Sequence, residues 1–72
     1  MMIPKVGDKV RFEPEHYELK GEFENGIVKE VREDIDYAVW VVYNCAGDWD
    51  CYRDYTAAKT NLRDLKAGWR ED

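Results

Sequence analysis

The feature that most constrains the fold is a short apolar run at residues 38–43 (AVWVVY), which is followed by Asn44 and Gly47. The run is too short for a buried helix, and its β-branched and aromatic residues favour an extended backbone. Both sides of the expected strand are at least partly apolar, as in a strand that is covered on two faces. A central strand is therefore predicted over Tyr37–Cys45, leading into a turn.

The remaining strands are predicted from the alternation of polar and apolar residues and from the turn residues between them. They cover residues 6–12, a segment from Phe23 or Gly26 to about Arg32, residues 50–56, and a short closing strand within 62–66. A helical turn is expected over 57–61, and a 3₁₀ turn is expected before the closing strand. These segments predict an all-β fold of five short antiparallel strands.

The second of these strands can be predicted in more detail. Asn25 and Gly26 stand near its start, and both tolerate positive φ. Because successive side chains of a strand point to opposite faces, Ile27, Lys29 and Val31 are expected on one face and Val28 on the other.

A long acidic connection, residues 13–24, follows the first strand. Pro14 and Gly21 interrupt any regular period, so a loop is predicted, held against the sheet by Tyr17 and Leu19. Two interpretations stay open: a solvated segment that keeps the protein soluble, or a surface for a basic partner. The acidic residues concerned are Glu13, Glu15, Glu18, Glu22 and Glu24.

Length and charge limit the possible functions. Seventy-two residues with a net charge of −5 are expected to form one domain, 1–72, whose small core supplies only about 3–5 kcal/mol unless a partner chain or cross-link adds to it. A homo-oligomer is therefore possible. Negative charge repels a phosphate backbone, which disfavours nucleic acid as a partner. No apolar segment is long enough to cross a membrane and no secretory signal is visible, so a soluble, cytoplasmic protein is expected.

Residue types that often carry chemistry are few. Cys45 and Cys51 are the only cysteines, and in an acidic chain without a secretory signal they are expected to be reduced. Their spacing differs from that of zinc sites and the nearby aspartates do not match a calcium loop, so no metal site is predicted. His16 is the single histidine, and the sequence identifies no catalytic partner for it. Neither catalytic residues nor a cofactor is predicted.

Three segments resemble the first three strands of KOW, Tudor and related SH3-like barrel modules: residues 6–12 (VGDKVRF), 26–31 (GIVKEV) and 39–43 (VWVVY). The similarity covers most of the chain. It implies a small five-stranded SH3-like barrel with a long acidic first loop and a 3₁₀ turn before the last strand. The chain also resembles, in overall style, short uncharacterised proteins of bacteriophages and mobile elements. Modules of this superfamily mostly bind other molecules, which implies a binding module and not an enzyme.

Aromatic and acidic residues gather around the turn after the central strand and supply the candidate ligand-binding site: Tyr43, Asp48, Trp49, Asp50, Tyr52 and Tyr55. In Tudor-like barrels, which the chain resembles, such aromatics form a cage for methylated lysine or arginine, and aromatic ring faces attract cations. Trp49 is expected to be exposed because it lies on a turn between two aspartates. Core packing is the competing interpretation for Trp40, Tyr43 and Tyr52.

The function expected from these residues is a non-enzymatic binding module that recognises a protein, peptide or small ligand through an aromatic-acidic surface. The two aspartates beside Trp49 would select a cationic or hydrogen-bond-donating partner. Two alternatives remain: a phage-type inhibitor that blocks a host protein with its acidic surface, and an oligomer that sequesters a small ligand between chains.

Overall fold

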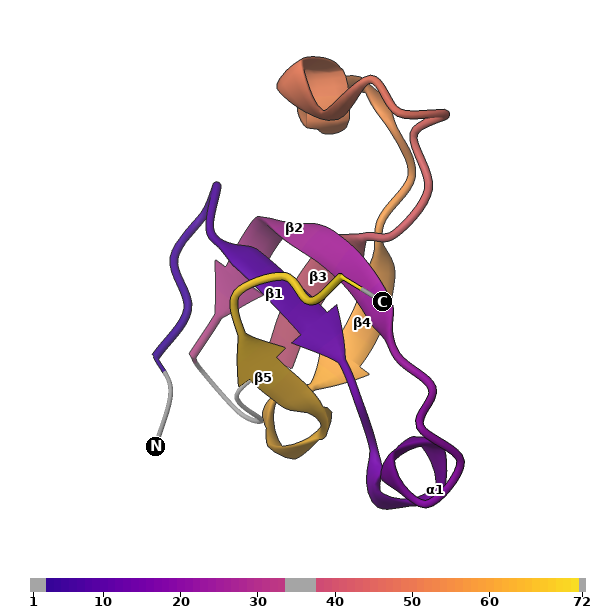
Figure 1. Ribbon diagram of the computed structural model, residues 1–72. Coiled ribbons are helices and arrows are strands. Elements are labelled where there is room, and N and C mark those ends of the chain that lie inside the picture. The colour runs from indigo at the N-terminus through magenta and orange to yellow at the C-terminus, as the bar shows by residue number, and fades with distance from the viewer. Residues whose placement is uncertain (1–2, 34–37, 72) are drawn as a thin grey trace.

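The computed structural model describes residues 3–33 and 38–71. Its elements are, in order, β1 (Lys9–Phe12), α1 (Glu15–Glu18), β2 (Glu24–Arg32), β3 (Ala38–Val42), η1 (Trp49–Asp54), β4 (Ala58–Asn61), η2 (Leu62–Asp64) and β5 (Leu65–Ala67). The elements η1 and η2 are 3₁₀ helices. The fold is built mainly from five strands, as predicted (Figure 1). Within these residues, no helix is long and apolar enough to span a membrane.

The five strands form one antiparallel sheet in the order β4-β3-β2-β1-β5. In the described part of the chain no ladder joins β4 to β5, so the strand pairing is that of an open sheet. The two edge strands are nevertheless consecutive in the chain, and only η2 lies between them. This helix is the 3₁₀ turn that the sequence predicts before the last strand.

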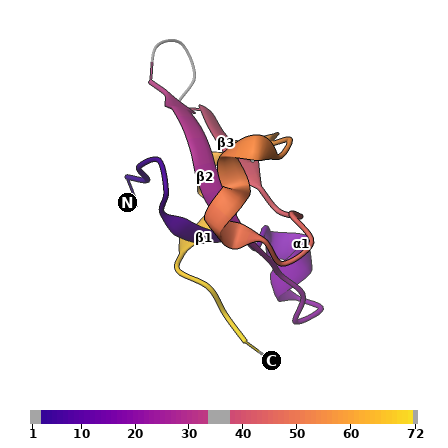
Figure 2. The same cartoon turned by 90° about the horizontal axis from the view of Figure 1, so that it is seen from above.

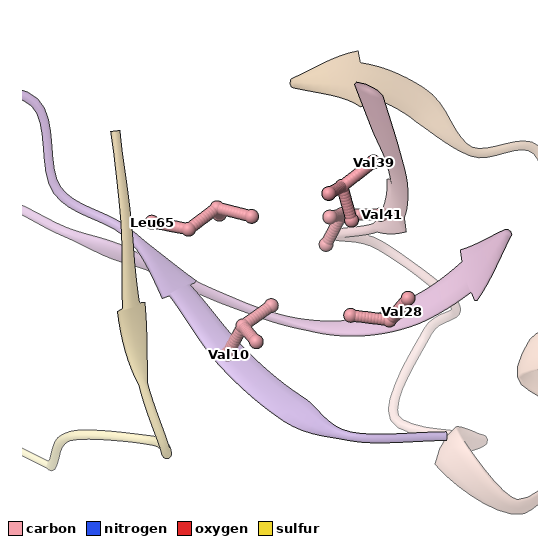
Figure 3. Packing of buried hydrophobic residues seen from close by; sticks show 5 residues of the cluster. All are labelled: Val10, Val28, Val39, Val41 and Leu65. Carbon is pink, nitrogen blue, oxygen red and sulfur yellow. The ribbon is translucent and has the colours of Figure 1, made fainter. Parts of the chain in front are cut away.

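An aliphatic core, here called the inner cluster, lies on one face of the sheet. Its buried members are Val10 from β1, Val28 from β2, Val39 and Val41 from β3, and Leu65 from β5. Their side chains converge between the strands, with Leu65 and Val10 facing the valines of β2 and β3 (Figure 3). Three of the four valines have no exposed surface at all. Burial of this apolar surface is the main force that holds the sheet together.

A β-bulge in β2 changes which residues face the inner cluster. Val28 pairs with Val41 and Glu30 pairs with Trp40, so one extra residue, Lys29, lies between the two pairs. The extra residue shifts the alternation, and Val31 therefore packs on the inner cluster together with Val28. The prediction that Val31 shares the face of Ile27 is wrong, because it assumes an uninterrupted strand.

Gly26 is required by packing and not by backbone conformation. It lies inside β2, and its φ is not positive, in contrast to the role expected from the sequence. A Cβ atom at this position would lie 2.5 Å from Cγ1 of Val41 and 2.9 Å from the carbonyl oxygen of Val42. The missing side chain therefore allows β3 to approach β2 closely.

The acidic connection between β1 and β2 contains α1, a single helical turn. Tyr17 holds it to the sheet as expected, because its ring packs edge-on against Phe12 with the centroids 5.3 Å apart. Leu19 has no such role, since 84 % of its surface is exposed. Helix α1 and η1 lie at opposite ends of the molecule (Figure 1).

The segment after β3 differs most from the sequence-based expectation. A strand is predicted over 50–56, but η1 occupies most of this segment. This element consists of two short helical turns that meet at a kink at Cys51, and Tyr55 follows it in an extended conformation. Trp49 and Tyr52 lie in η1. Trp49, Tyr52 and Tyr55 all contact the same apolar cluster. Packing of these aromatic rings therefore accounts for the helix.

The helical turn predicted over 57–61 is likewise replaced by a strand, β4. Thr60 is buried and pairs with Val39 of β3. Its hydroxyl lies 2.8 Å from the hydroxyl of Tyr43. Because β3 needs a hydrogen-bonding partner on its open side, tertiary pairing overrides the local preference of this polar segment.

Candidate binding surface

A second apolar cluster, here called the outer cluster, lies on the other face of β2 and β3. Its buried members are Ile27, Val42, Cys45 and Tyr52, and the residues packed against them are Trp49, Tyr55, Ala57 and Trp69. Ile27 and Val42 are the direct neighbours of Val28 and Val41, so alternation along the strands separates the two clusters. Seen from above, η1 lies over β2 (Figure 2). Most of the predicted site residues belong to this region.

Trp49 is half-buried, which corrects the expectation that it is exposed. Its ring packs against that of Trp69, with the centroids 4.8 Å apart and the planes inclined by 60°. Asp48 and Asp50, on either side of Trp49, predict that the whole turn is exposed. In a helix, however, adjacent residues point in different directions. The aspartates therefore face solvent while the indole lies on the outer cluster.

The aromatic pair formed by Trp49 and Trp69 is held in a defined position and already carries a cation. Nε1 of Trp69 donates a hydrogen bond of 2.7 Å to the carbonyl oxygen of Gly26. The ammonium nitrogen of Lys9 lies 4.6 Å from the centroid of the Trp69 ring. A cation at this distance is attracted by the electrons of the ring face.

Carboxylates surround the exposed side of η1. Asp48, Asp50 and Asp54 are all exposed. Asp48 accepts a hydrogen bond from the Cys51 thiol and repels the thiolate, and both effects raise the pKa of Cys51. Cys45 and Cys51 are free thiols, the first buried and the second exposed. A raised pKa leaves little thiolate near neutral pH, which makes Cys51 a weak nucleophile.

The three tyrosines of the predicted site have different environments. Tyr52 is buried in the outer cluster, and Tyr55 is half-buried beside it. Burial is the main cause that raises the pKa of Tyr55, and the negative charge of Asp48 raises it further. Tyr43 instead packs on the inner cluster and against Phe12, and burial raises its pKa to about 12. The structure thus brings together Asp48, Trp49, Asp50, Tyr52 and Tyr55, while Tyr43 lies apart from them.

The acidic connection is partly neutralised by ion pairs. Glu13 is buried and accepts hydrogen bonds from Arg11 at 2.9 Å and from Arg70 at 3.1 Å. The hydrogen bond from Arg11, with the positive charges of Arg11 and Arg70, lowers the pKa of Glu13 despite the opposing effect of burial. Glu18 lies 3.4 Å from Lys66. These contacts reduce the charge that the connection can offer to a basic partner.

Among residues 3–33 and 38–71, no group of three or more His, Cys, Asp and Glu side chains could hold a metal ion. His16 is exposed on α1, and its ring contacts Tyr17 with the centroids 4.9 Å apart.

No protein-family model, curated protein or solved structure matches this chain. The similarity to SH3-like modules therefore stays a prediction, and the function has to be argued from the geometry of the surface.

The sequence-based site omits two residues that complete the aromatic pair. Trp69 is more than fifteen residues from the predicted turn, and Lys9 lies on β1. Only the pairing of β1 with both β2 and β5 brings these residues next to η1. Local spacing contains no signal for such a contact, although three tryptophans in so short a chain suggest that Trp69 packs somewhere.

Proposed function

We propose that this protein is a non-enzymatic binding module that recognises a cationic segment of a protein or peptide through the exposed side of η1. The observation that carries the proposal is the aromatic pair of Trp49 and Trp69, which is in contact with the ammonium of Lys9 and has the exposed carboxylates of Asp48 and Asp50 on either side of Trp49 in the chain. Aromatic faces and carboxylates attract the same ligand, a cation that donates hydrogen bonds.

The charges on η1 favour a cation over an anion. Asp48, Asp50 and Asp54 are exposed within seven residues, whereas Arg53 is the single basic residue of the helix. Exposed charges act mainly on the rate of encounter and on the choice of partner. The half-buried indole of Trp49 supplies apolar contact area, which is typical of residues that contribute most to binding energy.

We also propose that the sheet curls into a small SH3-like barrel. Five strands laid flat at about 4.8 Å spacing would place the edge strands about 19 Å apart. The chain from Asn61 at the end of β4 to Leu65 at the start of β5 can span only about 14 Å. A curled sheet encloses the inner cluster and leaves the outer cluster on its convex side, where a partner can reach it.

Fluorescence polarisation with defined peptides tests the binding proposal. The probes are labelled Gly/Ser peptides that carry lysine, methylated lysine or arginine, with a glutamine peptide as the neutral reference. We expect a cationic peptide to bind and the glutamine peptide not to bind. The double variant Asp48→Asn/Asp50→Asn should weaken binding at least about tenfold, and added salt should weaken binding to the wild type.

The matched control removes two exposed carboxylates at the other end of the molecule. Glu15→Gln/Glu22→Gln causes the same change in net charge but lies in the acidic connection, remote from η1 (Figure 1). We expect it to change the affinity less than about twofold, as is usual for charges outside the contact area. A larger loss in this control than in the η1 variant would assign binding to the acidic connection. Absence of binding to every cationic peptide would overturn the proposal.

A further inference from the structure

The segment that follows β5, residues 68–71, is here called the strap. Gly68 has a φ of +79°, which turns the chain back over β1 and β2. Its amide donates a hydrogen bond of 2.9 Å to the carbonyl oxygen of Lys9. In Figure 1 the strap is the yellow segment that crosses β1 after β5. It forms no strand, and side chains of the sheet hold it.

Asn25 recognises the backbone of the strap. Its Nδ2 donates a hydrogen bond of 2.8 Å to the carbonyl oxygen of Arg70, and its Oδ1 accepts one of 3.0 Å from the amide of Arg70. The side-chain amide of Asn25 therefore pairs with both backbone groups of one residue, as a neighbouring strand would. Such pairing contributes affinity but does not depend on the side chain that is bound.

Selectivity for particular side chains comes from two adjacent positions. The first holds Trp69, whose indole N–H is bonded to Gly26 and whose ring packs on Trp49. The second holds Arg70, whose guanidinium donates to Oε2 of the buried carboxylate of Glu13 at 3.1 Å. These are one position for an aromatic residue and one for a basic residue.

The position for arginine is completed by an aromatic ring. The guanidinium carbon of Arg70 lies 5.2 Å from the ring centroid of Phe23, so the cation meets a carboxylate and a ring face at once. Arginine suits such a position better than lysine because its planar group can stack on a ring and donate hydrogen bonds in plane. Glu13 is further oriented by Arg11 at 2.9 Å.

We propose that this surface is a binding site for an extended peptide of a partner protein in which an aromatic residue is followed by arginine, and that the strap occupies the site in cis. Backbone capture by Asn25 beside two selective side-chain positions is the arrangement of a peptide-recognition site. The tethered strap has an effective concentration of the order of millimolar, so a partner peptide has to displace it.

The peptide site and the surface of the proposed function share the aromatic pair, because Trp49 belongs to η1 and Trp69 belongs to the strap. They are tested separately through residues that they do not share: Asn25 and Glu13 hold the strap, whereas Asp48 and Asp50 border Trp49 in the chain. If the strap peptide binds to no folded variant while the wild type still binds the cationic Gly/Ser peptides, only the peptide site is overturned.

The test uses the full chain and the labelled peptide Gly-Trp-Arg-Glu-Asp, which has the sequence of residues 68–72. In the variant Trp69→Ala/Arg70→Ala the strap loses both of its selective side chains while the site keeps all of its own. We expect this variant to bind the peptide at least about tenfold more tightly than the wild type, because the competing strap is weakened. Addition of Asn25→Ala to this variant should remove most of the binding. The peptide Gly-Ala-Ala-Glu-Asp is the control and should not bind.

Circular dichroism and thermal unfolding establish whether each variant is folded. If the double variant does not fold, Arg70→Ala takes its place in the binding assay. In addition, millimolar strap peptide is added to the wild type, and NMR follows the resonance of the Trp69 indole N–H. Displacement of the strap would shift that resonance. No binding to any folded variant, together with an unchanged resonance, overturns the proposal. A wild-type dimer that Asn25→Ala dissociates would identify a second copy of this chain as the occupant instead and would also overturn it.

Discussion

The inner and outer clusters of this small sheet are built by different means. The buried members of the inner cluster are aliphatic residues from the strands, and the valines are almost completely buried. The outer cluster combines two strand residues with aromatic rings from η1 and from the strap, several of them half-buried. The inner cluster is thus almost fully enclosed, whereas the outer cluster leaves aromatic side chains partly exposed, which is where we propose that a partner binds.

The difference follows from the nature of the side chains. Branched aliphatic residues fill the space between strands and have no group that could recognise a ligand. Indole and phenol rings also bury a large apolar area, but each carries a polar group and a face that attracts cations. Four predictions test whether the two regions differ in this way.

The largest effect is expected for Leu65→Ala in the inner cluster. Leu65 is 5 % exposed, and truncation of a buried leucine costs about 2–5 kcal/mol because it leaves a cavity. Since a domain of this size is stabilised by only about 3–5 kcal/mol, much of the protein should be unfolded at room temperature. Urea unfolding followed by circular dichroism measures the loss. Leu19→Ala is the control, because its exposed side chain should change stability by less than about 0.5 kcal/mol.

Trp49→Ala in the outer cluster should have a smaller but measurable effect on stability. The ring packs on Trp69, and we expect a loss of about 1–2 kcal/mol from the missing contact. The variant should also lose binding of the cationic Gly/Ser peptides. Trp49→Phe should retain part of the stability and part of the peptide affinity. Thermal unfolding measures the stability, and fluorescence polarisation measures the affinity. A fully unfolded Trp49→Ala protein would show that the outer cluster is as essential to the fold as the inner one.

Glu13 links the acidic connection to the strap, and its effect should depend on pH. Its pKa is lowered below the ordinary value of 4.5, so its ion pairs stabilise the protein above that pH, and this stabilisation is lost as the pH falls through the lowered value. Glu13→Gln should therefore be less stable than the wild type at neutral pH, with a smaller difference at about pH 3. Urea unfolding at both pH values tests this. Glu22→Gln, which removes an exposed carboxylate of the same connection, should show a smaller change between them.

The smallest effect is expected in the reactivity of the thiols. In the native protein Cys51 should react with a thiol reagent while Cys45 does not, because only Cys51 is exposed. Asp48→Asn should accelerate the reaction of Cys51, since it removes the charge that raises the pKa of the thiol. Mass spectrometry counts the labels and follows their rate. After denaturation without reductant both thiols should react, and a failure that reductant reverses would reveal a disulfide.

Some of the architecture is visible in the sequence because it rests on local patterns. The apolar run of β3, the alternation in β1 and the 3₁₀ turn before β5 are all contained in a few neighbouring residues. The doubly apolar character of β3 also indicates that both of its faces are covered, as Val41 and Val42 show by entering different clusters. Asp48, Trp49 and Asp50 can be identified as neighbours of a turn for the same reason.

The features that the sequence does not predict depend on contacts between residues that are distant in the chain. The bulge at Lys29 moves the residues that follow it in β2 to the opposite face, and no turn residue in the sequence predicts it. Residues 50–56 alternate in polarity as a strand would. The rings of Trp49, Tyr52 and Tyr55 nevertheless pack on the outer cluster, and this burial favours the helical turns of η1 over a strand. The aromatic pair exists only because β5 lies beside β1 and returns Trp69 to η1. A sequence pattern records which face of an element is apolar, but the partner of that face is chosen by the packing of the whole chain.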